Sequence, residues 1–144
     1  MQRECLAGLI SLACSDGACY VSYLCLATAQ FDRVFQFYRE VLAFPMVREW
    51  DRPNARGALL DLNGLRLELL DAMREQRPFA LHPPGDRLHV VVEVPDVDAV
   101  YRSLALELPE PTTASWGARW FVVRDPDGVP LSFVQWIASD RSNE

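Results

Sequence analysis

Two stretches of helical periodicity organise the pattern of hydrophobic and polar positions along this chain. In residues 31–42 and again in residues 96–106, apolar side chains recur at every third or fourth position, which predicts two helices that each bury one face. Val97 in the second stretch lies 66 positions after Phe31 in the first. The pattern therefore occurs twice, with one helix near the start of each half.

Short apolar, β-prone stretches flank both helices and predict strands. The Asn63-Gly64 pair is typical of a two-residue hairpin turn, and the DPDG sequence at 125–128 predicts a second turn. Residues 73–86 contain three prolines and no periodicity, which predicts a linker. The predicted strands are 20–26, 46–50, 58–62 and 65–70 in the first half, and 88–94, 112–114, 118–123 and 131–137 in the second.

Each half thus consists of a strand, a helix and three more strands. Neither half can bury both its helix and its sheet alone, so we expect one α+β domain made of two βαβββ modules. At 144 residues the chain is long enough to bury such a core without disulfides. The expected parts are an N-terminal extension (1–19), module one (20–72), a linker (73–85), module two (86–137) and a C-terminal tail (138–144).

The chain is acidic, with a formal net charge of −6 and a pI of about 4.9. Such a chain repels the phosphates of nucleic acids, and no segment reaches the ~18–20 uncharged apolar residues of a membrane helix. We therefore expect no nucleic-acid partner and no membrane association. The charge favours a cationic ligand, but it is also typical of a surface that keeps a protein soluble.

All four cysteines lie within the first 25 residues and form no CxxC pair. Free thiols in a reducing compartment, the cytoplasm, are the expected state. The apolar run at 5–15 leaves open a weak signal or lipoprotein peptide acylated at Cys14. The acidic residues Glu4 and Asp16 beside this run argue against it.

Four motifs in order carry a family likeness. FYREVLAF at 37–44 resembles the end of a family helix in which Ala43 replaces the usual glycine, and LEL at 67–69 resembles a family strand. HVVVEV followed by DVD at 89–98, and WGARWF followed by DPDG at 116–128, complete the set. Over residues 20 to 137 the chain thus resembles the glyoxalase/bleomycin-resistance/extradiol-dioxygenase superfamily, also called the vicinal oxygen chelate superfamily, and most of all its bleomycin-resistance-like members.

This resemblance implies a curled mixed sheet around a concave cleft, commonly in a homodimer. It implies no single function, because the fold is shared by isomerases, lyases, dioxygenases, epimerases and drug-sequestering proteins. Metal-dependent members place ligands at four equivalent strand positions. In this sequence those positions are Tyr23, Glu68, His89 and Ser132.

Only two of these four residues are strong metal donors. Glu68 and His89 suit a divalent metal, whereas neutral Tyr23 and Ser132 are poor ligands. Two donors rarely hold a catalytic metal, so we expect no metal ion and no other cofactor. Strand alternation places Glu68 and His89 away from the apolar strand faces, and it puts Gln135 on the opposite face from Ser132. We expect all four to converge on one concave face.

Several roles remain open for the polar residues. His89 is a structural histidine with a hydrogen-bond partner, a ligand contact or a metal ligand. Glu68 either pairs with an arginine such as Arg66 or, if buried in the cleft, serves as a general base with a raised pKa. His82 lies in the proline-rich linker and is expected to be solvated, without a role.

Tryptophans are frequent in this chain, at positions 50, 116, 120 and 136. Core packing accounts for some of them, while others lining a groove can stack on a flat or cationic ligand. The Trp116-Gly117 segment stands where bleomycin-resistance-type members place a ligand-facing loop. We therefore expect Trp116 or Trp120 to border the cleft.

The leading hypothesis is a metal-independent protein that binds and sequesters a small aromatic or cationic compound, as in antibiotic resistance. The alternative is a lyase, isomerase or dioxygenase with a divalent metal ion on Glu68 and His89. A metal-free enzyme with Glu68 as base and a pure interaction domain also stay open, so enzyme activity is undecided. The expected ligand-binding residues are Tyr23, Glu68, His89, Trp116, Trp120 and Ser132.

Overall fold

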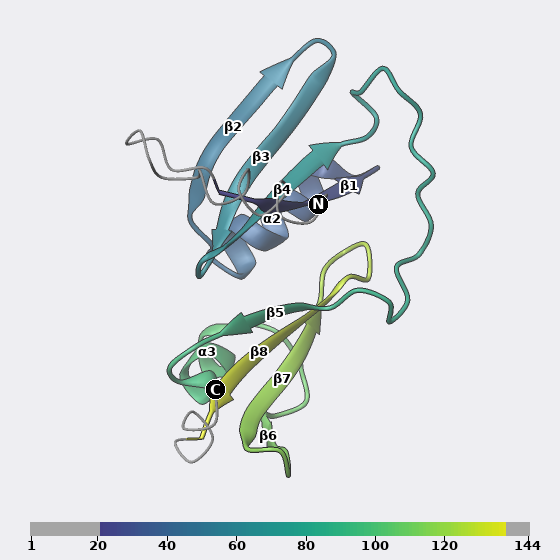
Figure 1. Ribbon diagram of the computed structural model, residues 1–144. Coiled ribbons are helices and arrows are strands. Elements are labelled where there is room, and N and C mark those ends of the chain that lie inside the picture. The colour runs from purple at the N-terminus through teal and green to yellow at the C-terminus, as the bar shows by residue number, and fades with distance from the viewer. Residues whose placement is uncertain (1–20, 138–144) are drawn as a thin grey trace, which may run out of the picture.

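The computed structural model describes residues 21–137, which form two four-stranded β-sheets, each with one helical segment (Figure 1). The expected N-terminal extension (1–19) and C-terminal tail (138–144) lie outside the described residues. In the described part of the chain, no helix is long and apolar enough to span a membrane.

Module one contains the first sheet, whose strands lie in the order β1-β4-β3-β2. Strand β1 pairs in parallel with β4, and the other two pairings are antiparallel. The elements are β1 (Tyr23–Thr28), α2 (Phe31–Gln36), the π-helix η1 (Phe37–Val41), β2 (Met46–Arg52), β3 (Ala55–Leu62) and β4 (Leu65–Asp71).

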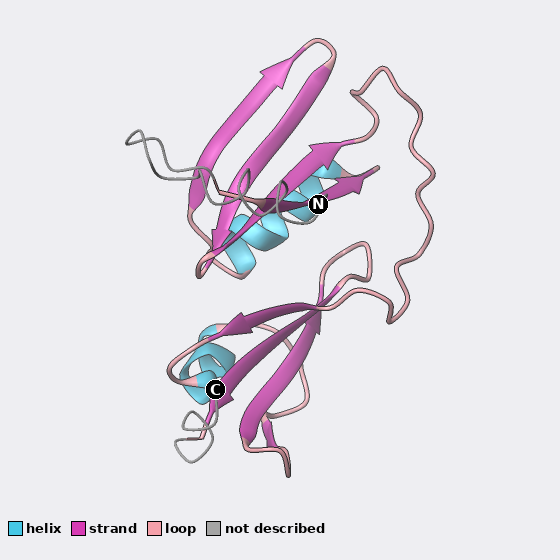
Figure 2. Cartoon of the chain, in the orientation of Figure 1, coloured by secondary structure: helices cyan, strands magenta, loops and turns pink. Residues whose placement is uncertain are grey.

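Module two repeats this arrangement in the order β5-β8-β7-β6, with β5 parallel to β8 (Figure 2). Its elements are β5 (Val90–Glu93), α3 (Val97–Ser103), β6 (Thr112–Thr113), β7 (Ala118–Arg124) and β8 (Pro130–Trp136). The two modules therefore share one topology, and the predicted α+β fold of two βαβββ modules is confirmed.

The helices differ from the sequence prediction in their last turns. The first helix widens after Gln36, where the Leu42 N–H donates to the Phe37 carbonyl at 2.9 Å, five residues back. The second helix ends at Ser103, short of the predicted 106, because Leu104 adopts an extended backbone (φ −83°, ψ 125°). The apolar side chains after Ser103 keep a helical spacing in the sequence because they still pack into the core from an extended backbone.

The hairpin between β3 and β4 is the one that the sequence predicted. Asn63 and Gly64 both have positive φ, 55° and 109°, as a type I′ turn requires. The Gly64 N–H also donates to the Asp61 side chain at 2.7 Å. This turn aligns β3 with β4 and so fixes which face each residue of β4 occupies.

One hydrophobic core joins the two modules. Buried residues of both sheets and of α2, η1 and α3 belong to a single cluster, in which Phe44 of module one stacks on Phe133 of module two at 6.2 Å between ring centroids. Polar contacts reinforce the junction, because Gln30 donates to Asp127 at 2.7 Å and Asn63 donates to the Glu93 carbonyl at 2.6 Å. Neither module buries its apolar face alone.

Candidate functional site

On the first sheet, alternation separates an apolar core face from an outward polar face. Leu67 and Leu69 of β4 are fully buried in the core, so Arg66 and Glu68 point away from it. This arrangement agrees with the prediction for β4. Tyr23 at the start of β1 is 50% exposed and lies beside Arg66 in the parallel register.

The neighbour of Glu68 on β1 is Cys25 rather than Tyr23. Burial is the main cause that raises the pKa of the Cys25 thiol, and the negative charge of Glu68 adds to it. The thiol is therefore protonated at neutral pH and a poor nucleophile. Sequence reasoning missed Cys25 because the strand register that pairs it with Glu68 is a tertiary property.

On the second sheet, β5 alternates in the same way. Val90 and Val92 are buried in the core, whereas Val91 is 52% exposed on the outward face beside Ser132 of β8. His89 lies just before β5 and is exposed, not buried in the helix-packed core. The Gln135 side chain accepts from the Val97 N–H at 2.9 Å, which confirms that it points to the helix side.

The four expected positions are divided between the two modules. Tyr23 and Glu68 belong to the first sheet, whereas Ser132 belongs to the second and His89 directly precedes it. The cavity that Ser132 lines includes none of the other three, and His89 lines a different one. The expected convergence of the four side chains on one concave face therefore stays a prediction.

A cavity of about 340 Å³ opens on the outward face of the second sheet. Its surface is dominated by indole rings and aliphatic groups, and Ser132 contributes a hydroxyl. Trp116 and Trp136 meet edge to face, with ring centroids 5.6 Å apart and an interplanar angle of 67°. The lining residues are Val91, Trp116, Trp120, Ser132, Val134 and Trp136.

Local backbone bonds place Trp116 on this face. The Gly117 N–H donates to the Ala114 carbonyl at 3.2 Å, and the Ile137 N–H donates to the Gly117 carbonyl at 3.0 Å. Gly117 has a positive φ of 94°, a conformation that glycine adopts without strain. The loop is thereby fastened to the end of β8, and the 51% exposed Trp116 ring is held beside Trp136.

Trp116 and Trp120, the two tryptophans expected to contact a ligand, both line this cavity. Trp136 lines it as well, although it was not among the expected contacts. The indole N–H of Trp136 donates to the Glu93 carboxylate of β5 at 2.8 Å. Alternation from Ser132 through Val134 to Trp136 places all three on one face, which is the signal that the sequence did contain. Trp50 has a different role, because its ring lies over Gly57 on the first sheet and under the Arg48 guanidinium.

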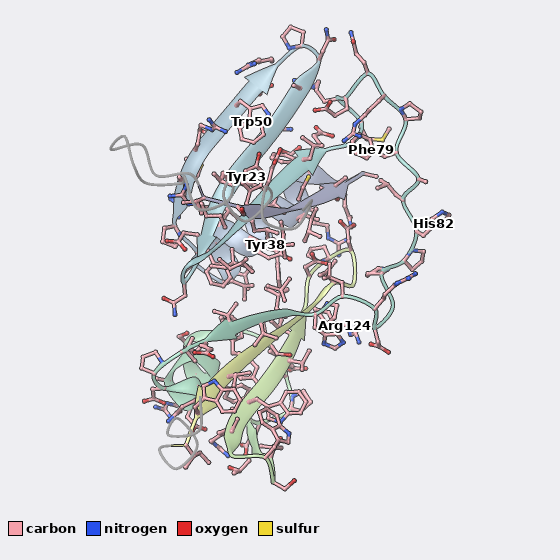
Figure 3. All side chains as sticks on the ribbon, viewed as in Figure 1. Tyr23, Tyr38, Trp50, Phe79, His82 and Arg124 are labelled. Atoms are coloured by element: carbon pink, nitrogen blue, oxygen red, sulfur yellow. The ribbon has the colours of Figure 1, made fainter. Side chains whose placement is uncertain are left out.

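The other polar candidates include Glu68 and His82. Among the described residues no ion pair includes Glu68, so the first of its two alternatives, pairing with an arginine, is not seen. His82 lies exposed on the linker, as expected (Figure 3), and it lines a cavity of about 430 Å³ together with Asp125 and Asp127. Figure 3 also shows Tyr23 on the first sheet, apart from Arg124 at the end of β7.

The residues present do not fit a metal site within the single chain. Over residues 21–137, no group of three or more histidine, cysteine, aspartate and glutamate side chains is arranged to hold a metal ion. Glu68 lies on the first sheet and His89 just before the first strand of the second, and Tyr23 and Ser132 are weak donors when neutral.

Comparison with known proteins gives a family match and a shared fold. Residues 20–133 match the model of the Glyoxalase/Bleomycin resistance protein/Dioxygenase superfamily. No curated protein matches the chain.

Solved structures from three bacteria resemble the chain at low identity. A glyoxalase/bleomycin resistance protein/dioxygenase from Nocardioides has 23% identity and a TM-score of 0.67, over 99% of this chain and 98% of its own. TioX from Micromonospora sp. ML1 has 21% identity and a TM-score of 0.60, over 83% and 98%. A lactoylglutathione lyase from Agrobacterium tumefaciens has 22% identity and a TM-score of 0.58, over 81% and 92%. At these identities the likeness establishes the fold alone.

Proposed function

This chain belongs to the glyoxalase/bleomycin resistance protein/dioxygenase superfamily, and on that premise we propose that it is a metal-independent protein that binds a small aromatic or cationic compound. Sequestration of a toxic compound, as in antibiotic resistance, is the role that such binding serves. The proposed ligand contacts are those expected from the sequence (Tyr23, Glu68, His89, Trp116, Trp120 and Ser132), with Trp136 added.

The observation that carries this proposal is the tryptophan-lined cavity on the second sheet. A cavity of about 340 Å³ suits a ligand of two or three fused rings, and three indoles offer faces and edges for stacking. Aromatic side chains also attract cations through the negative potential of their ring faces. The net charge of −6 also favours the approach of a positively charged ligand.

The donor set supports binding without a metal. Glu68 and His89 are the two strong donors among the four family positions, and they belong to different modules, with Glu68 in β4 and His89 just before β5. Metal analysis of the purified protein tests this part of the proposal directly. We expect a substoichiometric metal content, whereas one tightly held divalent ion per chain, lost in a Glu68→Gln variant, would favour the alternative of a metal-dependent lyase, isomerase or dioxygenase.

We further propose that the protein is a cytoplasmic homodimer. Each chain presents one pair of family positions on the first sheet and the other pair on or next to the second, so a second copy is a natural means of completing a site from both pairs. The exposed apolar residues on the strands, such as Met46, Val47 and Val91, are consistent with a further contact. Sedimentation that shows only monomer at micromolar concentration contradicts this assembly.

Fluorescence titration with a flat cation such as proflavine tests the binding function. We expect micromolar affinity and a loss of at least about five-fold in Trp116→Ala, since a cation–π contact contributes about 1 kcal/mol or more when desolvated. Trp50→Ala is the matched control, because Trp50 lies on the first sheet over Gly57, away from the cavity. Absence of binding to proflavine and to a panel of similar flat cations contradicts the proposal.

A further inference from the structure

A carboxylate accepts a hydrogen bond from one of the cavity's aromatic rings. The Glu93 Oε1 atom accepts the Trp136 indole N–H at 2.8 Å, and both side chains project from the outward face of the second sheet. Glu93 is not among the residues that line the cavity. Glu93 therefore affects a ligand in this cavity indirectly, through its hydrogen bond with Trp136.

We propose that Glu93 is a positioning residue that orients the Trp136 ring and makes its face more negative, so that the cavity selects cationic aromatic ligands over neutral ones of the same shape. This inference rests on the proposed binding function, because it concerns the same cavity. The ligand class is flat monocations, and the source of the preference is the Glu93 carboxylate on strand β5.

Two physical effects support this selectivity. A hydrogen bond from an indole N–H to a carboxylate is charge-assisted, and it shifts electron density from the donor into the ring. Since the attraction of a cation to an aromatic face depends on the ring's negative potential, the contact strengthens with that shift. The same bond holds the Trp136 ring edge to face with Trp116, so both rings are ordered before a ligand arrives.

Both arginines of β7, the strand that pairs with β8, have carboxylate partners. Arg119 of β7 forms a two-pronged ion pair with Asp98, at 2.7 and 2.8 Å. Arg124 at the other end of β7 pairs with Asp86 at 3.0 Å. Each of these two guanidinium groups therefore already has a counter-charge.

A pair of probes separates charge from shape. N-methylquinolinium is a flat monocation, and 1-methylnaphthalene is a neutral ring of nearly the same size. Titration of the wild-type protein at low ionic strength is expected to give at least about five-fold tighter binding of the cation, consistent with a cation–π contribution of about 1 kcal/mol. Added salt is expected to reduce this ratio, since screening weakens the charge of the partly exposed Glu93.

Two variants of Glu93 distinguish its charge from its hydrogen bond. Glu93→Gln keeps an oxygen acceptor and removes the charge, so the ratio should fall toward one while the affinity for 1-methylnaphthalene stays unchanged. Glu93→Ala also releases the Trp136 ring, so it should weaken both ligands and alter the near-ultraviolet circular dichroism of the tryptophans. Glu49→Gln, on the exposed strand β2 of the first sheet, makes the same change in net charge and should leave the ratio intact.

The outcomes also separate this inference from the binding function. If the wild type binds both probes but Glu93→Gln keeps the wild-type ratio, Glu93 has no role in selectivity and the inference is wrong. If the wild type binds neither probe, the proposed function fails and this inference fails with it. A Glu93→Gln ratio near one, together with an unchanged Glu49→Gln ratio and equal unfolding midpoints, supports it.

Discussion

The Tyr38 hydroxyl donates a hydrogen bond to the Asp125 carboxylate at 2.8 Å, across 87 positions of sequence. Tyr38 belongs to the helix of module one, and Asp125 begins the turn between β7 and β8 of module two. The second carboxylate oxygen accepts the backbone N–H groups of Asp127 and Val129, each at 2.9 Å. One buried carboxylate thus shapes its own turn and holds the two modules together.

Removal of this hydroxyl is expected to weaken the junction. Tyr38→Phe leaves the buried Asp125 charge with one donor fewer, which should lower the free energy of unfolding by about 1–3 kcal/mol. Tyr101→Phe is the matched control, because the Tyr101 hydroxyl donates to the neutral Leu108 carbonyl at 2.8 Å within module two. Urea denaturation should show the larger loss for Tyr38→Phe, and equal losses would contradict an inter-module role for the charge.

The cost of Tyr38→Phe should also depend on pH. Burial is the main cause that raises the pKa of Asp125 above its ordinary value, and the hydrogen bond from Tyr38 opposes this rise. A group with a raised folded-state pKa contributes most stability when protonated, and this contribution is lost as the pH rises through the folded pKa. Without the hydroxyl the pKa of Asp125 rises further.

The difference in unfolding free energy between wild type and Tyr38→Phe should therefore shrink as the pH falls and Asp125 becomes protonated. Wild type and Tyr38→Phe must be compared at each pH, because other groups also titrate. Asp98 behaves in the opposite way, since the hydrogen bond from Arg119 lowers its pKa and its contribution to the free energy of unfolding is lost in acid. Taking the difference cancels that common loss. A difference that stays constant from neutral to acidic pH contradicts the assignment.

Ala43 occupies a strained position where a family glycine is usual. Its φ is 58°, in the left-handed region that costs a residue with a Cβ about 1–2 kcal/mol. We therefore expect Ala43→Gly to stabilise the protein by about 0.5–1 kcal/mol, net of the added freedom of the unfolded chain. Ala99→Gly within α3 is the control and should destabilise it. Thermal unfolding of the two variants should shift in opposite directions.

Gly57 allows the Trp50 ring to lie flat on the first sheet. A Cβ at position 57 would overlap this ring and would lie 2.7 Å from the Leu69 backbone oxygen. Gly57→Ala is expected to destabilise the protein by about 1–3 kcal/mol, as overpacking does. Removing the ring as well, in Gly57→Ala with Trp50→Ala, should relieve only part of the strain because the backbone contact remains. Chemical denaturation of the single and double variants measures both effects.

His89 offers a test of the ligand site that is separate from folding. It is exposed and makes none of the hydrogen bonds found among the described residues, so His89→Ala should change the unfolding free energy by less than about 0.5 kcal/mol. On our proposal the same change weakens binding of proflavine, because His89 lines a cavity that shares Trp120 with the tryptophan-lined one. An unchanged dissociation constant removes His89 from the ligand contacts.

The sequence by itself determined the repeated βαβββ topology and the faces of most strands. Helical and strand periodicity are properties of neighbouring residues, so the 66-residue repeat and the Asn63-Gly64 turn were sufficient to predict two modules. Alternation likewise predicted that Gln135 and Ser132 face opposite sides. These features need no knowledge of which distant segments meet.

Only the tertiary structure decided which residues form the candidate site. Strand register pairs Cys25 with Glu68, and a loop fastened to the end of β8 brings Trp116 onto Trp136. The same is true of Glu93, whose bond to the Trp136 indole spans two strands that are neighbours in the sheet but 43 positions apart in sequence. Such contacts depend on how whole sheets pack, which periodicity within one segment does not specify.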